Sequence, residues 1–118
     1  MTAQEWPSKL KVSPDKALLT VEFEGGESFE LPAEMLRVMS PSAEVQGHSP
    51  AERKTVGGKR NVKIAAIRPV GNYAARISFD DGHDTGIFAW SYLHYLGSGR
   101  EALWVQYLAE LDEKGLTR

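Results

Sequence analysis

The sequence contains no cysteine. That absence excludes disulfides, thiolate metal sites, cysteine nucleophiles and cysteine-ligated iron–sulfur clusters from this chain. No apolar run approaches the roughly 20 residues that cross a bilayer. The N-terminal stretch "MTAQEWPSKLKV" also lacks the charged-then-apolar order of a signal peptide. We therefore expect a cytoplasmic protein with no membrane partner.

An excess of charge of one sign is also missing. The formal net charge is −2 over 118 residues, so the chain exerts no global electrostatic pull on nucleic acid. With 42% hydrophobic and 25% charged residues, the composition is typical of a soluble globular domain. The length suits one domain over residues 1–118, because two domains would each have a marginal core. Composition does not predict the oligomeric state.

Alternating apolar residues and glycine turns predict a series of short hairpins. Residues 17–23 show the period of two that is typical of a half-buried strand, and Gly25-Gly26 then predicts a turn into a second strand, "SFEL". Pro32 can begin a helix over "PAEMLRVM", because its missing N–H is not needed there. Further strands are expected at 62–67 and 73–79, joined through Pro69 and a Gly-Asn turn.

Two stretches resemble each other without a gap. "VEFEGGESFELPAEML" aligns with "ISFDDGHDTGIFAWSY", so that Phe23 falls on Phe79, Gly26 on Gly82 and Leu31 on Ile87. Each copy predicts strand, glycine turn, strand and short helix. We therefore expect an α+β fold, with a small antiparallel sheet built from two β-β-α units.

A longer helix is expected at the C-terminus. Ser98 and Glu101 have the spacing of a capping box, and Gly115 offers a stop. One face of this helix is apolar and is expected to pack in the core, with partner binding as the alternative. The predicted core consists of Leu19, Val21, Phe23, Ile64, Ile77, Phe79, Ile87, Leu103 and Leu108.

The stretch "DDGHD" is the first candidate site. A hairpin turn explains Asp81-Gly82 fully, so a solvated turn whose carboxylates cap local amides is one interpretation. The pattern lacks the oxygen ligands of a calcium loop and the His-x-Asp/Glu pair of an iron triad, and His94 is expected to pack on its helix. The other interpretation is a small-molecule or metal-ion binding site made of Asp81, His83, Asp84, Glu44 and His48.

A basic loop is the second candidate. Residues 46–61 are rich in Gly, Ser, Lys and Arg and predict a mobile loop. Its "VGGK" lacks the remaining residues of a Walker loop. The loop is either solvated or docks to an acidic partner or a phosphate-bearing ligand, and the residues that would do so are Arg53, Lys54, Lys59, Arg60 and Lys63.

The stretches "LRVMSPSAEVQGH" and "RPVGNYAARISFDDGHDTGIFAWSYLHYLG" resemble the gamma-butyrobetaine hydroxylase-like N-terminal domain family, over roughly residues 10–96. In carnitine-pathway hydroxylases this domain precedes an iron-dependent catalytic domain and holds a structural zinc. Small bacterial proteins carry the domain alone, and a plant iron–sulfur scaffold carries a similar one. The resemblance implies a non-catalytic accessory or adaptor domain that binds another protein, linked to metal or iron–sulfur metabolism. We expect no enzyme activity and no cofactor.

The family's zinc motif is degenerate in this sequence. The motif L-R-x-x-C-P-C-x-x-C is followed by a histidine in an Asp-Gly-His turn, and here Ser40, Ser42 and Val45 stand at the cysteine positions while His83 stands at the histidine. One imidazole and two neutral hydroxyls do not reproduce a tight zinc site. We therefore expect His83 to be a hydrogen-bonding group, with Ser40 or Ser42 within direct or one-water reach.

Overall fold

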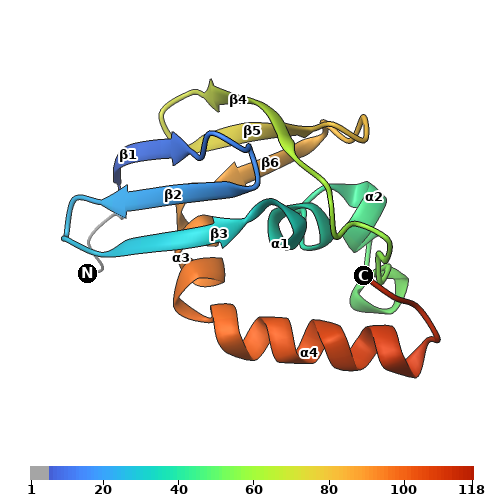
Figure 1. The fold of residues 1–118 in the computed structure, drawn as a ribbon. Coiled ribbons are helices and arrows are strands. Elements are labelled where there is room, and N and C mark those ends of the chain that lie inside the picture. Colours follow the sequence, from blue (N-terminus) through green and yellow to red (C-terminus); the bar gives the residue numbers. More distant parts are fainter. Residues whose placement is uncertain (1–5) are drawn as a thin grey trace.

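A computed structural model describes residues 6–118 of the chain (Figure 1). The elements follow in the order β1 (Pro7–Val12), β2 (Leu18–Phe23), β3 (Ser28–Pro32), α1 (Ala33–Val38), α2 (Ala43–Gln46), the 3-10 turn η1 (Pro50–Glu52), β4 (Ile64–Val70), β5 (Ala74–Phe79), β6 (Gly86–Ala89), α3 (Trp90–Ser98) and α4 (Arg100–Glu113). This confirms the α+β class. Within the described range, no helix combines the length and the apolar character needed to cross a membrane.

The strands divide into two three-stranded antiparallel sheets, β1-β2-β3 and β4-β5-β6, rather than one. The alternation predicted for residues 17–23 is present, since Leu19, Val21 and Phe23 of β2 are buried. The sequence pattern did not predict β1, an edge strand with two exposed lysines in which even the apolar residues are only half-buried. Pro69, predicted to lie in a connection, falls inside β4, where an edge position tolerates proline.

The two units share the same hairpin turn, as the sequence repeat predicted. In each, the carbonyl of Glu27 or His83 accepts a hydrogen bond from the amide of the phenylalanine four residues earlier, at 2.8 and 2.9 Å respectively. Gly26 and Gly82 both have positive φ, at 99° and 91°, which glycine adopts without strain. His83 therefore occupies in the second unit the place that Glu27 occupies in the first.

The gapless repeat alignment fails by one residue in the third strand. Leu31 pairs with Leu19 across the first sheet, whereas Phe88 pairs with Ala75, the equivalent of Leu19, across the second. A slip of one residue turns a side chain to the other face of a strand. Phe88 is accordingly buried and Ile87 is 46% exposed, so the prediction of Ile87 as a core residue is wrong.

Each unit's turn lies against the helix of the other unit. Arg37 at the end of α1 pairs with Asp81 in the turn between β5 and β6, at 2.7 Å from Nε to Oδ2. His94 on α3 pairs with Glu27 in the turn between β2 and β3, also at 2.7 Å, and packs edge-on against Phe29. This reciprocal arrangement places the "DDGHD" turn beside the chain that follows α1.

One core joins both sheets with α1 and α3. Its buried apolar residues are Leu19, Val21, Phe23, Leu31, Ala33, Met35, Leu36, Val62, Ile64, Ile77, Phe79, Phe88, Leu93 and Leu96. A smaller cluster, made of Val38, Tyr107 and Leu111, holds α4 beneath this body. Of the two residues of α4 that were predicted to lie in the core, Leu103 is half-buried. The prediction for Leu108 is wrong, because this residue is 38% exposed.

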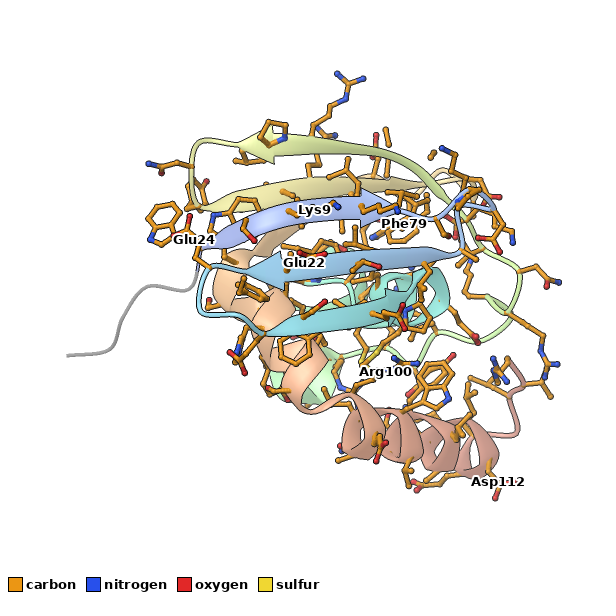
Figure 2. The ribbon with its side chains drawn as sticks, turned by 60° about the vertical axis from the view of Figure 1, so that its left-hand side comes forward. Lys9, Glu22, Glu24, Phe79, Arg100 and Asp112 are labelled. Carbon is orange, nitrogen blue, oxygen red and sulfur yellow. The ribbon has the colours of Figure 1, made fainter. Side chains whose placement is uncertain are left out.

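The predicted capping box at the start of the C-terminal helix is also wrong. Ser98 ends α3, where its hydroxyl donates to the carbonyl of Tyr95, and α4 begins after Gly99 with no side-chain cap. Figure 2 shows Arg100 at this start, where its guanidinium donates to the carbonyl of Glu30 on the free edge of β3 at 2.7 Å. The contact anchors α4 to the first sheet. The predicted stop is confirmed, since Gly115 follows α4 with φ at 68°.

The last residues pack back onto α1. Arg118 makes two hydrogen bonds to the buried carboxylate of Glu34, at 2.7 and 3.0 Å, and its guanidinium carbon lies 5.4 Å from the ring centre of Trp104. The hydrogen bonds to the Glu34 carboxylate raise the pKa of Arg118 further, so the guanidinium stays charged. The amide of Gly58 adds a 2.8 Å hydrogen bond to the carbonyl of Thr117.

Candidate functional site

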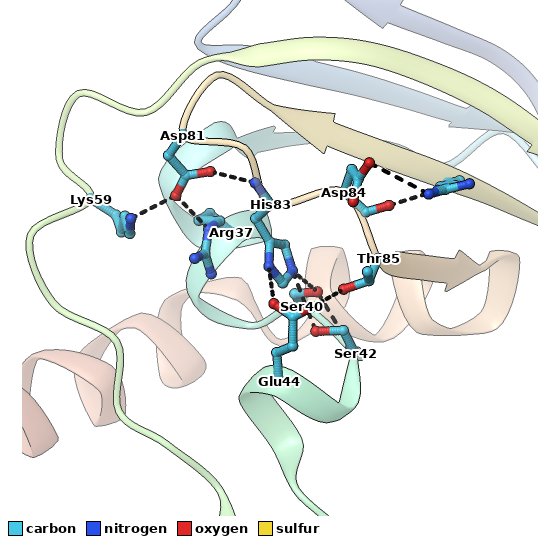
Figure 3. A network of polar contacts seen from close by, with 10 residues as sticks. Arg37, Ser40, Ser42, Glu44, Lys59, Asp81, His83, Asp84 and Thr85 are labelled. Atoms are coloured by element: carbon cyan, nitrogen blue, oxygen red, sulfur yellow. Dashed lines mark hydrogen bonds and ion pairs between the residues drawn. The ribbon is translucent and has the colours of Figure 1, made fainter.

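The imidazole of His83 meets two serines, as the resemblance led us to expect. His83 extends from the turn between β5 and β6, and both serines follow α1, with Pro41 between them (Figure 3). Nε2 lies 3.0 Å from Ser40 Oγ and 3.3 Å from Ser42 Oγ. All three side chains are buried, and Ser40 Oγ also accepts the amide of Ser42. The cluster therefore fixes the entry into α2.

The other ring nitrogen of His83 faces a carboxylate. Nδ1 lies 3.3 Å from Glu44 Oε2, and the hydroxyl of Thr85 donates to Glu44 Oε1 at 3.0 Å. Burial lowers the pKa of His83, as does the charge of Arg37, while the carboxylates of Glu44 and Asp81 act in the opposite direction with less effect. The neutral form of His83 therefore predominates at pH 7. Because Glu44 can only accept, the tautomer that fits has Nδ1 protonated and Nε2 accepting from a serine.

Asp81 forms the second half of the cluster. Its Oδ2 accepts from Arg37 Nε at 2.7 Å and from Lys59 Nζ at 2.6 Å, and its Oδ1 accepts the amide of His83 at 3.1 Å. Burial alone would raise the pKa of this carboxyl. The hydrogen bonds from Lys59, the His83 amide and Arg37 outweigh it and hold the pKa well below its usual range. Asp81 is thus a fixed anion that ties the turn to α1 and to the basic loop.

The order serine, histidine and carboxylate matches that of a hydrolase triad, but the surroundings exclude this chemistry at Ser40. The Ser40 side chain has no exposed surface. A Cβ on Gly86 would overlap Ser40 Oγ and would lie 3.0 Å from the ring of Phe88, so the backbone of β6 covers the hydroxyl. An attacking oxygen needs an electrophilic carbon about 3 Å away, and the backbone of Gly86 occupies that space.

The remaining residues of the predicted binding site do not join the cluster. Asp84 turns outward, where its carboxylate pairs with Arg76 at 3.5 Å. His48 lies on an exposed stretch after α2, and its amide bonds to Glu52. Among residues 6–118, no hydrogen bond or ion pair connects His48 with His83. Arg37 and Thr85, which the sequence did not mark as members of the cluster, take part instead.

The basic loop does not form one positive patch. Arg53 pairs with Glu110 of α4 at 2.6 Å, and the exposed Lys54 donates its amide to the carbonyl of Val45 on α2. Lys59 pairs with Asp81, and the backbone of Lys63 pairs with Asp80. Arg60 is exposed at a shallow polar depression beside Lys59 and Asp81. The five residues predicted to act together thus lie in three settings: Arg53 and Lys54 near α2 and α4, Lys59 and Arg60 beside Asp81, and Lys63 beside Asp80.

The donor set at His83 does not fit the zinc that the family resemblance implies. Nε2 already contacts two neutral hydroxyls and Nδ1 a carboxylate, and Val45 offers no donor. Over the described part of the chain, no group of three or more histidines and carboxylates converges as metal ligands would. Neutral hydroxyls are poor zinc ligands compared with thiolates. The cluster is therefore a hydrogen-bonded joint between the two units.

A cavity of about 300 Å³ lies behind this joint, between α3, α4 and the loop after α2. Two of its lining residues hold the chain just before and at Ser40. Tyr92 donates its hydroxyl to the carbonyl of Met39 at 2.5 Å, and Gln46 donates its amide to the carbonyl of Ser40 at 2.9 Å. No sequence pattern indicates this cavity, because its lining residues come from five separate segments.

The fold and the site define a small α+β domain in which a buried histidine and two serines join two hairpin units. The chain belongs to the family described as gamma-butyrobetaine hydroxylase-like, N-terminal, whose profile matches residues 10–94. The match is to the N-terminal domain alone. No functionally curated protein matches the sequence.

Solved structures agree with this assignment. Two solution NMR structures are 44% and 45% identical to the chain, with TM-scores of 0.85 and 0.83. They cover 98% and 100% of this chain and 91% and 90% of their own. A crystal structure of a protein of unknown function from Acidithiobacillus ferrooxidans, of the DUF971 family, is 34% identical, with a TM-score of 0.64 over 77% of this chain and 91% of its own.

Proposed function

We propose that this chain is a non-catalytic accessory or adaptor domain that binds another protein. The observation that carries the proposal is the exposure of large apolar side chains on the two C-terminal helices. Tyr95 of α3 is 54% exposed, and Val105 and Leu108 of α4 are 67% and 38% exposed. Of these, Tyr95 lines the cavity between α3 and α4, and aromatic and aliphatic side chains left in water favour a protein partner.

The closed state of the His83 cluster supports a binding role over an enzymatic one. Both ring nitrogens are engaged, and the backbone of Gly86 covers Ser40. The second candidate, a small-molecule or metal-ion module at the Asp-Gly-His turn, has less support because Asp84 and His48 lie outside the cluster. The link to metal or iron–sulfur metabolism rests on the sequence resemblance to domains fused to such proteins.

The test is capture of partners from extract of the protein's own cells. Immobilised protein should retain one or a few proteins, and each should bind again as a purified sample in calorimetry. Metal content and thermal shift with metal ions, measured on the same preparation, address the second candidate. If a metal ion binds at His83 and no purified partner binds, that second candidate is favoured instead.

A further inference from the structure

The cavity behind Ser40 has an apolar floor and one aromatic wall. The floor consists of Val38, Met39, Leu96, Leu103 and Tyr107. The wall is the stacked pair of Tyr92 and Tyr95, whose ring centres lie 5.9 Å apart at 26°. Because Tyr95 is half-exposed at the mouth, an apolar group that enters the cavity would cover it.

Two of the three phenols in this cavity, those of Tyr92 and Tyr107, already donate to the protein backbone. Tyr107 donates its hydroxyl to the carbonyl of Val56 at 2.5 Å, as Tyr92 does to Met39. Burial raises the pKa of both tyrosines to about 12, so they are neutral. At these two tyrosines the cavity therefore presents ring surface rather than free hydroxyls, which suits an aromatic or branched aliphatic side chain.

The rim of the cavity is positive, although the chain as a whole carries a net charge of −2. Arg53 and Lys114 flank the single carboxylate of Glu110, the first by a 2.6 Å ion pair and the second through Thr55 at 2.8 Å. Lys54 stands beside them, exposed, and its side chain has no hydrogen bond or ion pair within residues 6–118. Among the lining residues, the two cations Arg53 and Lys54 stand against the one carboxylate of Glu110, which leaves local positive charge unmatched.

From this geometry we infer that the cavity receives one aromatic or branched apolar side chain of a protein partner, flanked in that partner by acidic residues. The apolar anchor fills the space between Tyr95 and Leu103, and the flanking carboxylates face Lys54 and Arg53. The inference rests on the proposed function, because it names the surface and the chemistry through which a protein partner would bind.

Three matched peptides provide the direct test. The first is acetyl-Asp-Glu-Phe-Leu-Glu-Asp-amide, the second replaces its acidic residues with lysine, and the third replaces Phe-Leu with Ala-Ala. Amide spectra of nitrogen-15-labelled protein should show shifts at Tyr95, Leu103 and Gln106 with the first peptide and a submillimolar dissociation constant. The second and third peptides should bind at least about tenfold more weakly.

Matched variants separate the cavity from the rest of the surface. Tyr95→Ala should weaken the first peptide about tenfold and Lys54→Glu about fivefold, the latter more at low salt than at high salt. The controls are Tyr73→Ala, which removes a tyrosine that is 57% exposed in the turn between β4 and β5, and Lys9→Glu on β1. Figure 2 places Lys9 on the sheet, away from α4, and both controls should bind as the wild type does.

The outcomes distinguish this inference from the proposed function. Equal binding of the three peptides, no binding, or shifts away from the cavity would overturn the inference. If wild type and Tyr95→Ala/Lys54→Glu retain the same purified partner equally, the inference fails and the proposed function stands. If the wild type sediments as a dimer that Tyr95→Ala dissociates, the occupant is a second copy, which also overturns it. Peptide binding with no partner from extract would instead count against the proposed function.

Discussion

The imidazole of His83 and the hydroxyl of Ser40 are buried against each other, with Nε2 3.0 Å from Oγ, although 43 residues separate them in the chain. The contact joins the hairpin turn of the second repeated unit to the segment that follows the helix of the first. Its surroundings are closed by Gly86 on one side and by Glu44 on the other. Stability at this joint is therefore sensitive to small changes in shape and charge.

Gly86→Ala should destabilise the protein, because the new methyl group would overlap Ser40 Oγ and press on Phe88. Overpacking of this kind costs about 1–3 kcal/mol of the free energy of unfolding. Gly25→Ala is the control, since a Cβ there meets nothing within 4 Å and its φ is not positive. Urea denaturation followed by circular dichroism measures both. Equal stability of the two variants would mean that β6 does not pack on Ser40.

The His83 cluster should make stability depend on pH. The pKa of His83 is lower in the folded protein than its unperturbed value of 6.5, so between the two values the unfolded chain binds more protons. Stability therefore rises with pH through this window and is lost as pH falls below about 6.5. The low pKa of Asp81 adds a second loss, as pH falls through the unperturbed value of 3.8.

Urea denaturation in steps between about pH 5 and pH 8 measures the first of these losses. His83→Gln should flatten the dependence in this range, and His48→Gln, at an exposed site outside the cluster, should not. Glu44→Gln should lower the pKa of His83 further, because the Glu44 carboxylate favours the protonated ring. Imidazole NMR titration reports that pKa directly. A higher pKa in Glu44→Gln would contradict the arrangement described.

Arg118→Ala should destabilise the protein by leaving the carboxylate of Glu34 buried without its partner. Glu34 is 6% exposed and Arg118 supplies both of its hydrogen bonds. Because the Arg118 side chain is itself 36% exposed, we expect a loss of about 1–3 kcal/mol rather than the larger cost of a fully buried pair. Adding Glu34→Gln should recover part of it. No recovery in the double variant would show that the lost contact with Trp104 dominates.

The sequence predicts those parts of the fold that local physics decides. The alternation in β2, the glycines at the two turns and the stop at Gly115 depend on near neighbours, and the structure agrees with them. The prediction for the third strand of the second unit was wrong, because a one-residue slip in pairing leaves the turn unchanged. The slip exchanges the faces of the strand on which Ile87 and Phe88 lie. The prediction of a capping box was wrong because Ser98 is the last residue of α3 and does not cap α4. The spacing of Ser98 and Glu101 does not decide between these two positions.

The candidate site shows the same division. A motif resemblance predicted that Ser40 or Ser42 would lie near His83, and the distances confirm it. No motif predicted the ion pair between Lys59 and Asp81, because that pairing depends on where the long loop lies in space. The cavity beside Tyr95 escaped prediction for the same reason, as its walls meet only when α3, α4 and the loop are packed together.

The protein should bind zinc at this site only when thiolate ligands are introduced. We expect the wild type to hold no stoichiometric zinc and its melting temperature to be unchanged by a chelator. Ser40→Cys/Ser42→Cys/Val45→Cys should bind one zinc ion, with release of protons from the thiols. Elemental analysis and chelator-dependent melting measure this, and the same triple variant with His83→Ala is the control. A chelator-sensitive wild type would reveal a metal site with other ligands.

Charge reversal in the basic loop should have unequal effects at Lys59 and Arg60. The sequence offers no reason for either reversal to disturb folding, but the structure offers one for Lys59. Its Nζ lies 2.6 Å from Asp81 Oδ2, and the two side chains are only 24% and 19% exposed. Lys59→Glu removes one stabilising charge from Asp81 and adds a repelling one, so we expect a loss of about 1–2 kcal/mol that salt reduces. Arg60→Glu, at an exposed position, should stay within about 0.5 kcal/mol of wild type.

Urea denaturation at low and high salt checks both variants. In an Asp81→Asn background, Lys59→Glu should lose much less of the free energy of unfolding than it does in the wild type. Equal losses in Lys59→Glu and Arg60→Glu would mean that the ion pair with Asp81 does not form in solution. If the losses differ as expected, Arg60→Glu is the variant with which to test the basic loop in partner capture, because it changes the charge without disturbing the joint at His83.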